Sequence, residues 1–137
     1  MSFPRDINAY AMENNRPGVT TPLEIASYEN DGIFIRGNDY YKKCPYADIL
    51  HVEASGSYST FYLKNASRLV AARRLATIER KLPDNHFVRV HRGFIVNRHH
   101  VDAYTGTTVR VGEKWFPVGD CYRKKVLDCL NILDALN

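Results

Sequence analysis

From residue 28 onward, the sequence is a succession of short segments in which apolar and polar residues alternate, separated by turn signals. In the segment 58–64, residues 58, 60 and 62 share one face of an extended chain, and residues 59, 61 and 63 share the other. Two-residue periodicity is typical of strands, and short strands joined by tight turns form antiparallel sheets. The sequence therefore predicts a mainly β fold of antiparallel strands.

Two segments carry their apolar residues at helical spacing instead. In residues 74–82, Leu75, Ile78 and Leu82 form one stripe, and Pro83 ends the helix. Residues 121–136 have a broad apolar face and predict a C-terminal helix. The expected strands are 33–36 and 40–43, which form a hairpin, then 48–53, 58–64, 68–71, the two runs that flank Gly93, and a last hairpin of 108–111 with 115–118.

The N-terminal part differs from the rest in composition. Residues 1–22 are rich in Asn, Pro, Gly and Thr, so we expect residues 1–27 to form an arm or linker and residues 28–137 to form one domain. A chain of 137 residues suffices for one globular domain. The sequence shows neither a secretory signal nor an apolar run near the ~18 residues of a membrane-spanning helix. We therefore expect a cytoplasmic protein that does not associate with membranes.

Positive charge is concentrated in one third of the chain. The net charge is +4, and residues 89–125 hold eight Lys or Arg against three Asp or Glu. Such a concentration attracts a polyanion, and nucleic acid is the polyanion that a basic cytoplasmic domain meets most often. The alternative is a solvated basic face without a partner.

The residue types needed for catalysis, cofactor binding or metal binding do not occur in the required patterns. No glycine-rich phosphate loop is present, and His99 and His100 are adjacent, so they point apart. The cysteines Cys44, Cys121 and Cys129 lack metal-ligand spacing. We therefore expect no cofactor, no metal and no enzyme activity, although a cysteine such as Cys44 paired in space with a histidine would give a small enzyme instead.

One motif carries a family resemblance. Residues 87–97 read F-x-R-x-H-R-x-(apolar)-(apolar)-V-N and follow Leu82-Pro83; the segment 48–58 precedes them and Phe116-Pro117-Val118 follows. Residues 28–133 thus resemble a LytTR-type DNA-binding domain, the output module of one class of bacterial response regulators in two-component systems, the LytR/AgrA family. The resemblance implies short antiparallel sheets arranged in series, with one short helix mid-chain and a C-terminal helix.

The resemblance also implies a function. Such domains regulate transcription by binding double-stranded promoter DNA at direct repeats, with loops that enter successive major grooves and a second copy on the second repeat. The 27 residues before the match are too few for a receiver domain or a membrane sensor. We therefore expect either a free-standing regulator that works with a separate sensor or receiver protein, or a domain cut from a longer chain.

Three regions match the contact loops of the family: residues 55–58, residues 91–93 and residues 119–124. Many members have Ser-Arg where this chain has Gly119-Asp120, so either Arg123 and Lys124 take over that contact or it is lost. Four further cations, Lys42, Lys43, Arg73 and Arg74, are expected to contribute less. The candidate DNA-binding residues are Ser55, Ser57, Tyr58, Arg89, His91, Arg92, Arg98, Tyr122, Arg123 and Lys124.

The chemistry of these side chains leaves some roles open. The Arg92 guanidinium can bond to both O6 and N7 of guanine, which discriminates between bases by about 1–3 kcal/mol. His91 either donates to a phosphate or braces its own turn, and Tyr58 either offers its hydroxyl to DNA or packs. Trp115, Phe87 and Phe94 are expected in the core. Competing functions are a single-stranded nucleic-acid or RNA-binding β module and an interaction adaptor that uses the C-terminal helix.

Overall fold

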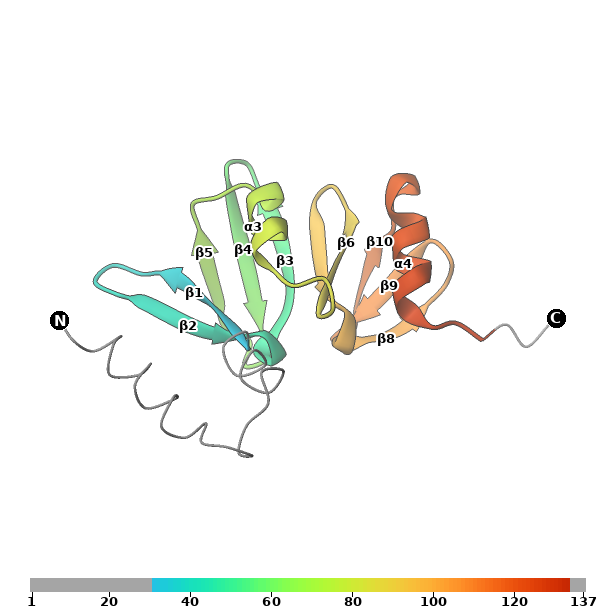
Figure 1. The fold of residues 1–137 in the computed structure, drawn as a ribbon, viewed down its shortest axis with the longest axis horizontal. Helices are drawn as coiled ribbons and strands as arrows, with labels where there is room; N and C mark the ends of the chain where they lie inside the picture. The colour runs from blue at the N-terminus through green and yellow to red at the C-terminus, as the bar shows by residue number, and fades with distance from the viewer. Residues whose placement is uncertain (1–30, 134–137) are drawn as a thin grey trace, which may run out of the picture. The chain divides into compact units, whose positions relative to one another are not determined.

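The computed structural model describes residues 31–133 of the chain, and all its strands pair antiparallel in three sheets (Figure 1). The first sheet is the hairpin of β1 (Gly32–Arg36) and β2 (Tyr41–Pro45), as the sequence predicts. The second has five strands and the third has three. The mainly β prediction is thereby confirmed, whereas the predicted arm at residues 1–27 lies outside the described residues.

The five-stranded sheet has the order β5-β4-β3-β7-β6. Its core forms because alternate residues of neighbouring strands face the same way: Val52 pairs with Phe61 on one side and with Ile95 on the other, and all three are buried. The short helix α3 (Leu75–Lys81) packs its stripe on this core through Leu75 and Ile78. The strands are β3 (Ile49–Ser55), β4 (Tyr58–Leu63), β5 (Arg68–Ala71), β6 (Phe87–His91) and β7 (Phe94–Asn97).

The three-stranded sheet has the order β10-β9-β8 and belongs to a second apolar cluster. Its strands are β8 (Val101–Tyr104), β9 (Thr108–Val111) and β10 (Lys114–Pro117), and the helix α4 (Arg123–Leu130) adds Val126. The sequence pattern predicts β9 and β10 but not β8. Short 3-10 turns, Tyr46–Asp48, Arg98–His100 and Asp120–Tyr122, precede β3, β8 and α4.

Strands β6 and β7 contribute to both clusters. Phe87 and Ile95 belong to the first, whereas Val88, Val90 and Val96 belong to the second. A strand buried on both faces reads as a continuous apolar run, which explains the sequence Phe94-Ile95-Val96. The turn between β6 and β7 therefore stands on a hairpin that packs into both apolar clusters.

Two expectations about the C-terminal part need correction. The helix predicted for residues 121–136 begins at Arg123 and ends at Leu130, because Asn131 adopts a left-handed conformation with φ 51°. Residues 134–137 lie outside the described part. Trp115, expected in the core, is 46% exposed, since β10 is an edge strand and its buried face is the one that carries Phe116. No helix within residues 31–133 has the length and apolarity to cross a membrane.

Candidate nucleic-acid interface

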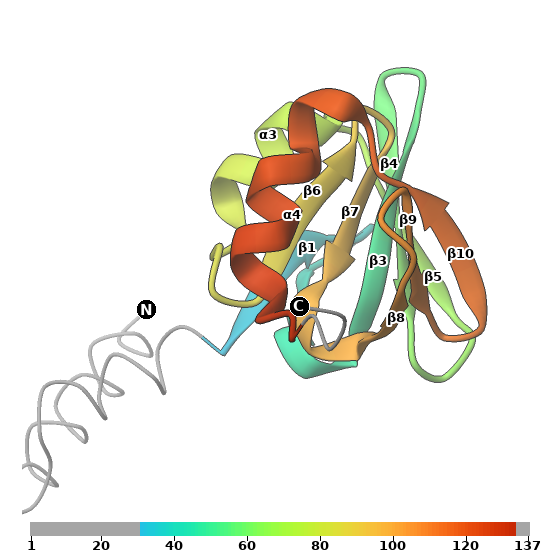
Figure 2. The same cartoon turned by 90° about the vertical axis from the view of Figure 1, so that its right-hand side faces the viewer.

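Three segments that the sequence analysis singles out lie at the same end of the sheets. They are the turn at residues 55–58 between β3 and β4, the turn at residues 91–93 between β6 and β7, and residues 119–124 at the start of α4; we call them the first contact turn, the second contact turn and the third contact segment. Figures 1 and 2 show all three along the upper edge of the domain. We call this end of the domain the contact edge.

Backbone hydrogen bonds join the three segments directly. The Ala54 amide, just before the first contact turn, donates to the Gly93 carbonyl at 2.9 Å. The Gly119 amide, at the start of the third contact segment, donates to the Val90 carbonyl at 2.8 Å. The second contact turn is thus held from both sides, and the spacing along the contact edge is fixed by the backbone.

In the first contact turn, every candidate side chain points to solvent. Gly56 has φ 62°, a left-handed conformation that glycine adopts without strain and that closes this short turn. Ser55 and Ser57 are exposed, and Tyr58 is 52% exposed although it begins a strand. Of the two roles that the sequence left open for Tyr58, packing in the core is therefore not the one observed, and its hydroxyl is accessible to a ligand.

In the second contact turn, the Arg92 side chain is exposed and faces no carboxylate within the described part of the chain. His91 braces the turn: its Nδ1 accepts a hydrogen bond of 3.0 Å from the Gly93 amide. An imidazole nitrogen that accepts carries no proton, so in this neutral ring the proton is on Nε2. His91 thus braces its own turn, one of the two roles that the sequence left open, and its Nε2 makes no hydrogen bond within residues 31–133.

Arg89 lies beneath the second contact turn with its side chain only 13% exposed. Its guanidinium donates to the carbonyl of His91 at 3.2 Å, to the carbonyl of Arg92 at 2.5 Å and to Glu79 Oε1 of α3 at 3.0 Å. Its carbon Cζ also lies 5.9 Å from the centre of the Tyr122 ring in the third contact segment. These contacts occupy the guanidinium inside the protein and make Arg89 a clamp for the turn.

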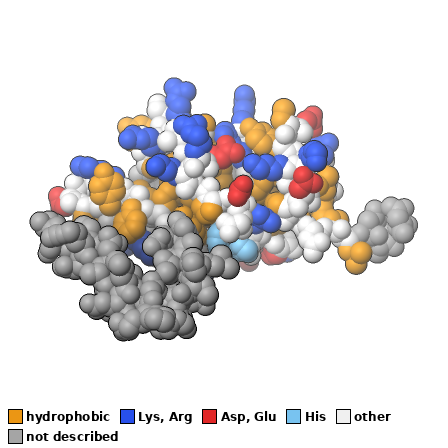
Figure 3. All heavy atoms as spheres, viewed as in Figure 1, with side chains coloured by type: hydrophobic (Ala, Val, Ile, Leu, Met, Phe, Trp, Pro, Cys, Tyr) orange, Lys and Arg blue, Asp and Glu red, His pale blue; other side chains and the backbone are white. Residues whose placement is uncertain are grey.

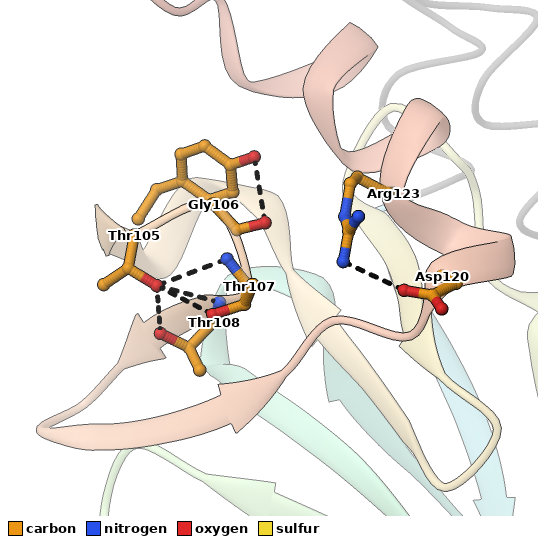
Figure 4. A network of polar contacts seen from close by, with 7 residues as sticks. Thr105, Gly106, Thr107, Thr108, Asp120 and Arg123 are labelled. Atoms are coloured by element: carbon orange, nitrogen blue, oxygen red, sulfur yellow. Dashed lines mark hydrogen bonds and ion pairs between the residues drawn. The ribbon is translucent and has the colours of Figure 1, made fainter.

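The third contact segment pairs its cations with nearby carboxylates. Arg123 donates to Asp120 Oδ1 at 3.0 Å, as Figure 4 shows, and Lys124 lies 3.4 Å from Asp128. The Asp120 side chain is 92% exposed, and such surface ion pairs are worth only ~0–1 kcal/mol. The Arg123 Nε atom is buried and has no hydrogen-bond partner among the described residues.

Figure 4 also shows the turn between β8 and β9. There the Thr105 hydroxyl oxygen accepts a hydrogen bond from the Thr108 amide.

Arg98 does not join the other candidates. It follows β7 at the end opposite to the second contact turn, and its guanidinium donates to the carbonyls of Asp84 at 2.8 Å and of Cys129 at 3.1 Å. These bonds attach the last turn of α4 to the loop before β6. In the structure, Arg98 therefore anchors the C-terminal helix.

Two arginines that the sequence predicts to contribute little to DNA binding lie at the contact edge. Arg73 and Arg74 follow β5, and the pairing of Ala71 with Ser59 places the end of β5 beside the start of β4. Both are exposed. The antiparallel register of β4 and β5 is the signal that could have revealed them, because it brings residue 72 and those after it beside the first contact turn.

A polar cluster within β3 connects this strand to β10. His51 Nε2 donates to Glu53 Oε2 at 2.9 Å, and Lys114 donates to the same oxygen at 2.6 Å. Burial lowers the pKa of His51, and the hydrogen bond and charge of Glu53 oppose this only in part. Burial would raise the pKa of Glu53, but hydrogen bonds from Lys114 and His51 outweigh it and lower that pKa. The pair is therefore a neutral histidine beside an ionised carboxylate.

The alternative of a small enzyme rests on Cys44, which the structure places in the core. Its side chain is 2% exposed, and burial, together with the charge of Asp48, raises the pKa of the thiol. A thiol with a raised pKa is a weak nucleophile. Within residues 31–133, no group of three or more His, Cys, Asp or Glu side chains is arranged to hold a metal ion.

Comparisons with known proteins agree with this architecture. The chain is 30% identical over 118 residues to the transcriptional regulatory protein YpdB of Escherichia coli O6:H1, an alignment that covers 86% of this chain and 44% of YpdB. The chain thus matches less than half the length of that relative. A solved LytTr DNA-binding domain from Bacillus cereus superposes with a TM-score of 0.61 at 22% identity, over 74% of this chain and 98% of that domain. Residues 39–130 match the LytTr DNA-binding domain family, and the chain belongs to that family.

Proposed function

We propose that this domain binds double-stranded promoter DNA in a sequence-specific manner and regulates transcription, with no catalytic step of its own. DNA binding for transcription regulation follows from the family; the proposal concerns how the contact edge reads the duplex. The observation that carries it is the exposed Arg92 guanidinium, which faces no described carboxylate and stands on a turn held by Arg89, His91 and two backbone bonds. Because the backbone of the turn is already ordered, binding has to order only the Arg92 side chain.

The contact edge suggests a division of labour among its side chains. Arg92 reads guanine through O6 and N7 in the major groove, and Ser55, Ser57 and Tyr58 supply hydroxyls to the next groove. Arg123 and Lys124 hold phosphates, which fixes the register on the duplex without reading sequence. Because these segments lie in a row, they reach successive grooves, and a curved duplex gains further contacts.

The remaining expectations belong to the same proposal. The DNA-binding domain comprises residues 28–137, preceded by an arm or linker at residues 1–27. It acts in the cytoplasm, a second copy occupies the second half of a direct repeat, and a separate sensor or receiver protein supplies the signal. YpdB is named a transcriptional regulatory protein and is more than twice as long as the region it shares with this chain.

The test is selection of bound duplexes from a random pool, followed by a salt titration of the selected site with the 137-residue chain. We expect Arg92→Ala to lose roughly 5- to 150-fold of the preference for the selected site over a site with one changed guanine, which corresponds to about 1–3 kcal/mol. Arg68→Ala removes an exposed arginine from the other end of β5 and should leave the preference unchanged.

Two outcomes would contradict the proposal. If single-stranded DNA or RNA of the same sequence competes better than the duplex, the chain is a single-strand-binding module instead. If affinity for the selected duplex does not fall with rising salt, phosphate contacts do not contribute, which is incompatible with this mode of binding.

A further inference from the structure

The connector between β5 and α3 carries two arginines, Arg73 and Arg74, that none of the three contact segments includes. Ser59, second residue of β4, pairs with Ala71 at the end of β5, and Ser55 pairs with Tyr58 across the first contact turn. The chain therefore leaves β5 at the contact edge, one ladder position from the pair of Ser55 and Tyr58 that bounds that turn. Figure 1 shows the connector rising to this edge before α3 begins.

The backbone of the connector is fixed from both sides. The hydroxyl of Ser59, a fully buried side chain, donates to the Arg73 carbonyl at 2.8 Å. The Arg74 carbonyl accepts from the amides of Thr77 at 3.0 Å and Ile78 at 3.2 Å in the first turn of α3. The next residue, Leu75, is 3% exposed and packs into the core. Two arginine side chains thus project from a rigid support rather than from a mobile loop.

The charges of this connector are not neutralised locally. Arg73 donates only to the neighbouring Ala72 carbonyl, and Arg74 makes no ion pair within residues 31–133. By contrast, Lys64, Arg110 and Lys114 each face a carboxylate. Figure 3 shows Lys and Arg side chains gathered along the upper edge of the molecule, where the contact edge lies. Arg92 lies at the same edge and likewise faces no described carboxylate, so unpaired arginines lie on both sides of the uncharged first contact turn.

We propose that Arg73 and Arg74 bind phosphodiester oxygens of the DNA backbone and so form a fourth contact, on the flank of the first contact turn. The proposal rests on the proposed function. A guanidinium offers donors in a planar fork that fits two oxygens of a phosphate. Phosphate contacts carry no sequence information. The connector therefore adds affinity and salt dependence and leaves base preference to the contact turns.

The experiment compares two double variants of the full chain that change the net charge equally. Arg73→Gln with Arg74→Gln removes the connector cations, whereas Lys64→Gln with Arg68→Gln removes two exposed cations from the opposite end of β4 and β5. Binding of the selected duplex is measured from low to physiological salt. We expect the first pair to reduce the slope of log affinity against log salt by about 1.8, or about 0.9 for each phosphate contact, and the second pair to leave it unchanged.

Each outcome decides one question. An equal reduction in both double variants would show a general effect of net charge and overturn the proposal, and so would an unchanged slope in the connector variant. A reduced slope accompanied by a changed base preference would also overturn it, because the connector would then be reading sequence. If the unmodified chain itself shows no salt-dependent duplex binding, the proposed function fails rather than this contact. Thermal unfolding of both variants confirms that each retains the fold.

Discussion

The second contact turn and the third contact segment reach the same edge of the domain, but their cations are held in opposite ways. At the turn, the half-buried Arg89 of β6 donates to two carbonyls, while the exposed Arg92 faces no described carboxylate. In the segment, Arg123 lies on Asp120 and Lys124 near Asp128. At the second contact turn, Arg89 thus holds the backbone that presents Arg92 to solvent. At the third contact segment, nearby carboxylates neutralise the cations.

This difference shows that position in a contact loop does not determine what an arginine does. Arg89 and Arg92 are three residues apart, yet the first makes four polar or ring contacts within the protein and the second presents its side chain to solvent. A guanidinium whose donors are already used must break those bonds before it can bind DNA. We therefore infer that the second contact turn reads the base sequence. The third contact segment adds affinity for phosphates, and its ion pairs with nearby carboxylates reduce that affinity.

The largest effect is expected from Arg89→Met. The variant leaves the carbonyls of His91 and Arg92 and the Glu79 carboxylate without this donor, which should lower the free energy of unfolding by about 1–3 kcal/mol. Base preference should fall as in Arg92→Ala, although Arg92 is still present. Urea unfolding and binding to the selected and changed sites measure the two effects.

Arg89→Lys serves as the control for charge. A lysine keeps the positive charge but cannot bridge two carbonyls and a carboxylate in the fixed fork of a guanidinium. If Arg89 positions the turn, the lysine variant loses base preference while its salt slope stays that of the unmodified protein. If the lysine variant keeps its base preference, Arg89 would act on DNA only through its positive charge. The second contact turn and the third contact segment would then not differ in how their cations are held.

A smaller effect, of opposite sign, is expected at the third contact segment. Asp120→Asn frees Arg123 from its carboxylate, and Asp120→Arg also adds a cation, so both should tighten duplex binding by a few-fold. Each new phosphate contact would steepen the salt slope by about 0.9. Asp102→Asn removes the same charge on β8, beside Arg110, and should have less effect. A weaker complex with Asp120→Arg would mean that this segment docks differently.

Much of the fold could be predicted because it depends on local patterns. The alternation in residues 58–63 appears in the structure as buried Ser59, Phe61 and Leu63, and the stripe of α3 packs as its spacing requires. The end of α4 could not, because Asn131 leaves the helix by adopting a left-handed conformation while apolar residues continue beyond it. The exposure of Trp115 could not be predicted either, because strand periodicity does not reveal which strand lies at a sheet edge.

The candidate site was predictable in position but not in the use of its side chains. The motif locates the second contact turn, yet the burial of Arg89 depends on Glu79, ten residues earlier on another element. The attachment of Arg98 to the Cys129 carbonyl depends on how α4 packs, so no local pattern predicts it. The pair of Asp120 and Arg123 differs, since its three-residue spacing is visible in the sequence.

The smallest effect is expected from mild acid, which acts on His51 of β3 and on His86 in the loop before β6. The pKa of His51 is lowered by burial, so the unfolded chain binds protons more readily and stability decreases as the pH falls below the ordinary value near 6.5. Glu53, whose pKa is also lowered, adds a further loss only below about 4.5. His86, with a pKa lowered by burial and by nearby His99 and Arg98, acts in the same direction as His51. Denaturant unfolding at pH 7.5 and 5.5 should show this loss of unfolding free energy. His51→Gln should make the loss smaller, and His86→Gln should remove a further, separate part of it.

The loss should also be local. Because the Ala54 amide, next to Glu53, donates to the Gly93 carbonyl, hydrogen exchange of the Gly93 region should rise before that of the third contact segment. Equal exchange in both regions at pH 5.5 would show that the two are not independently anchored.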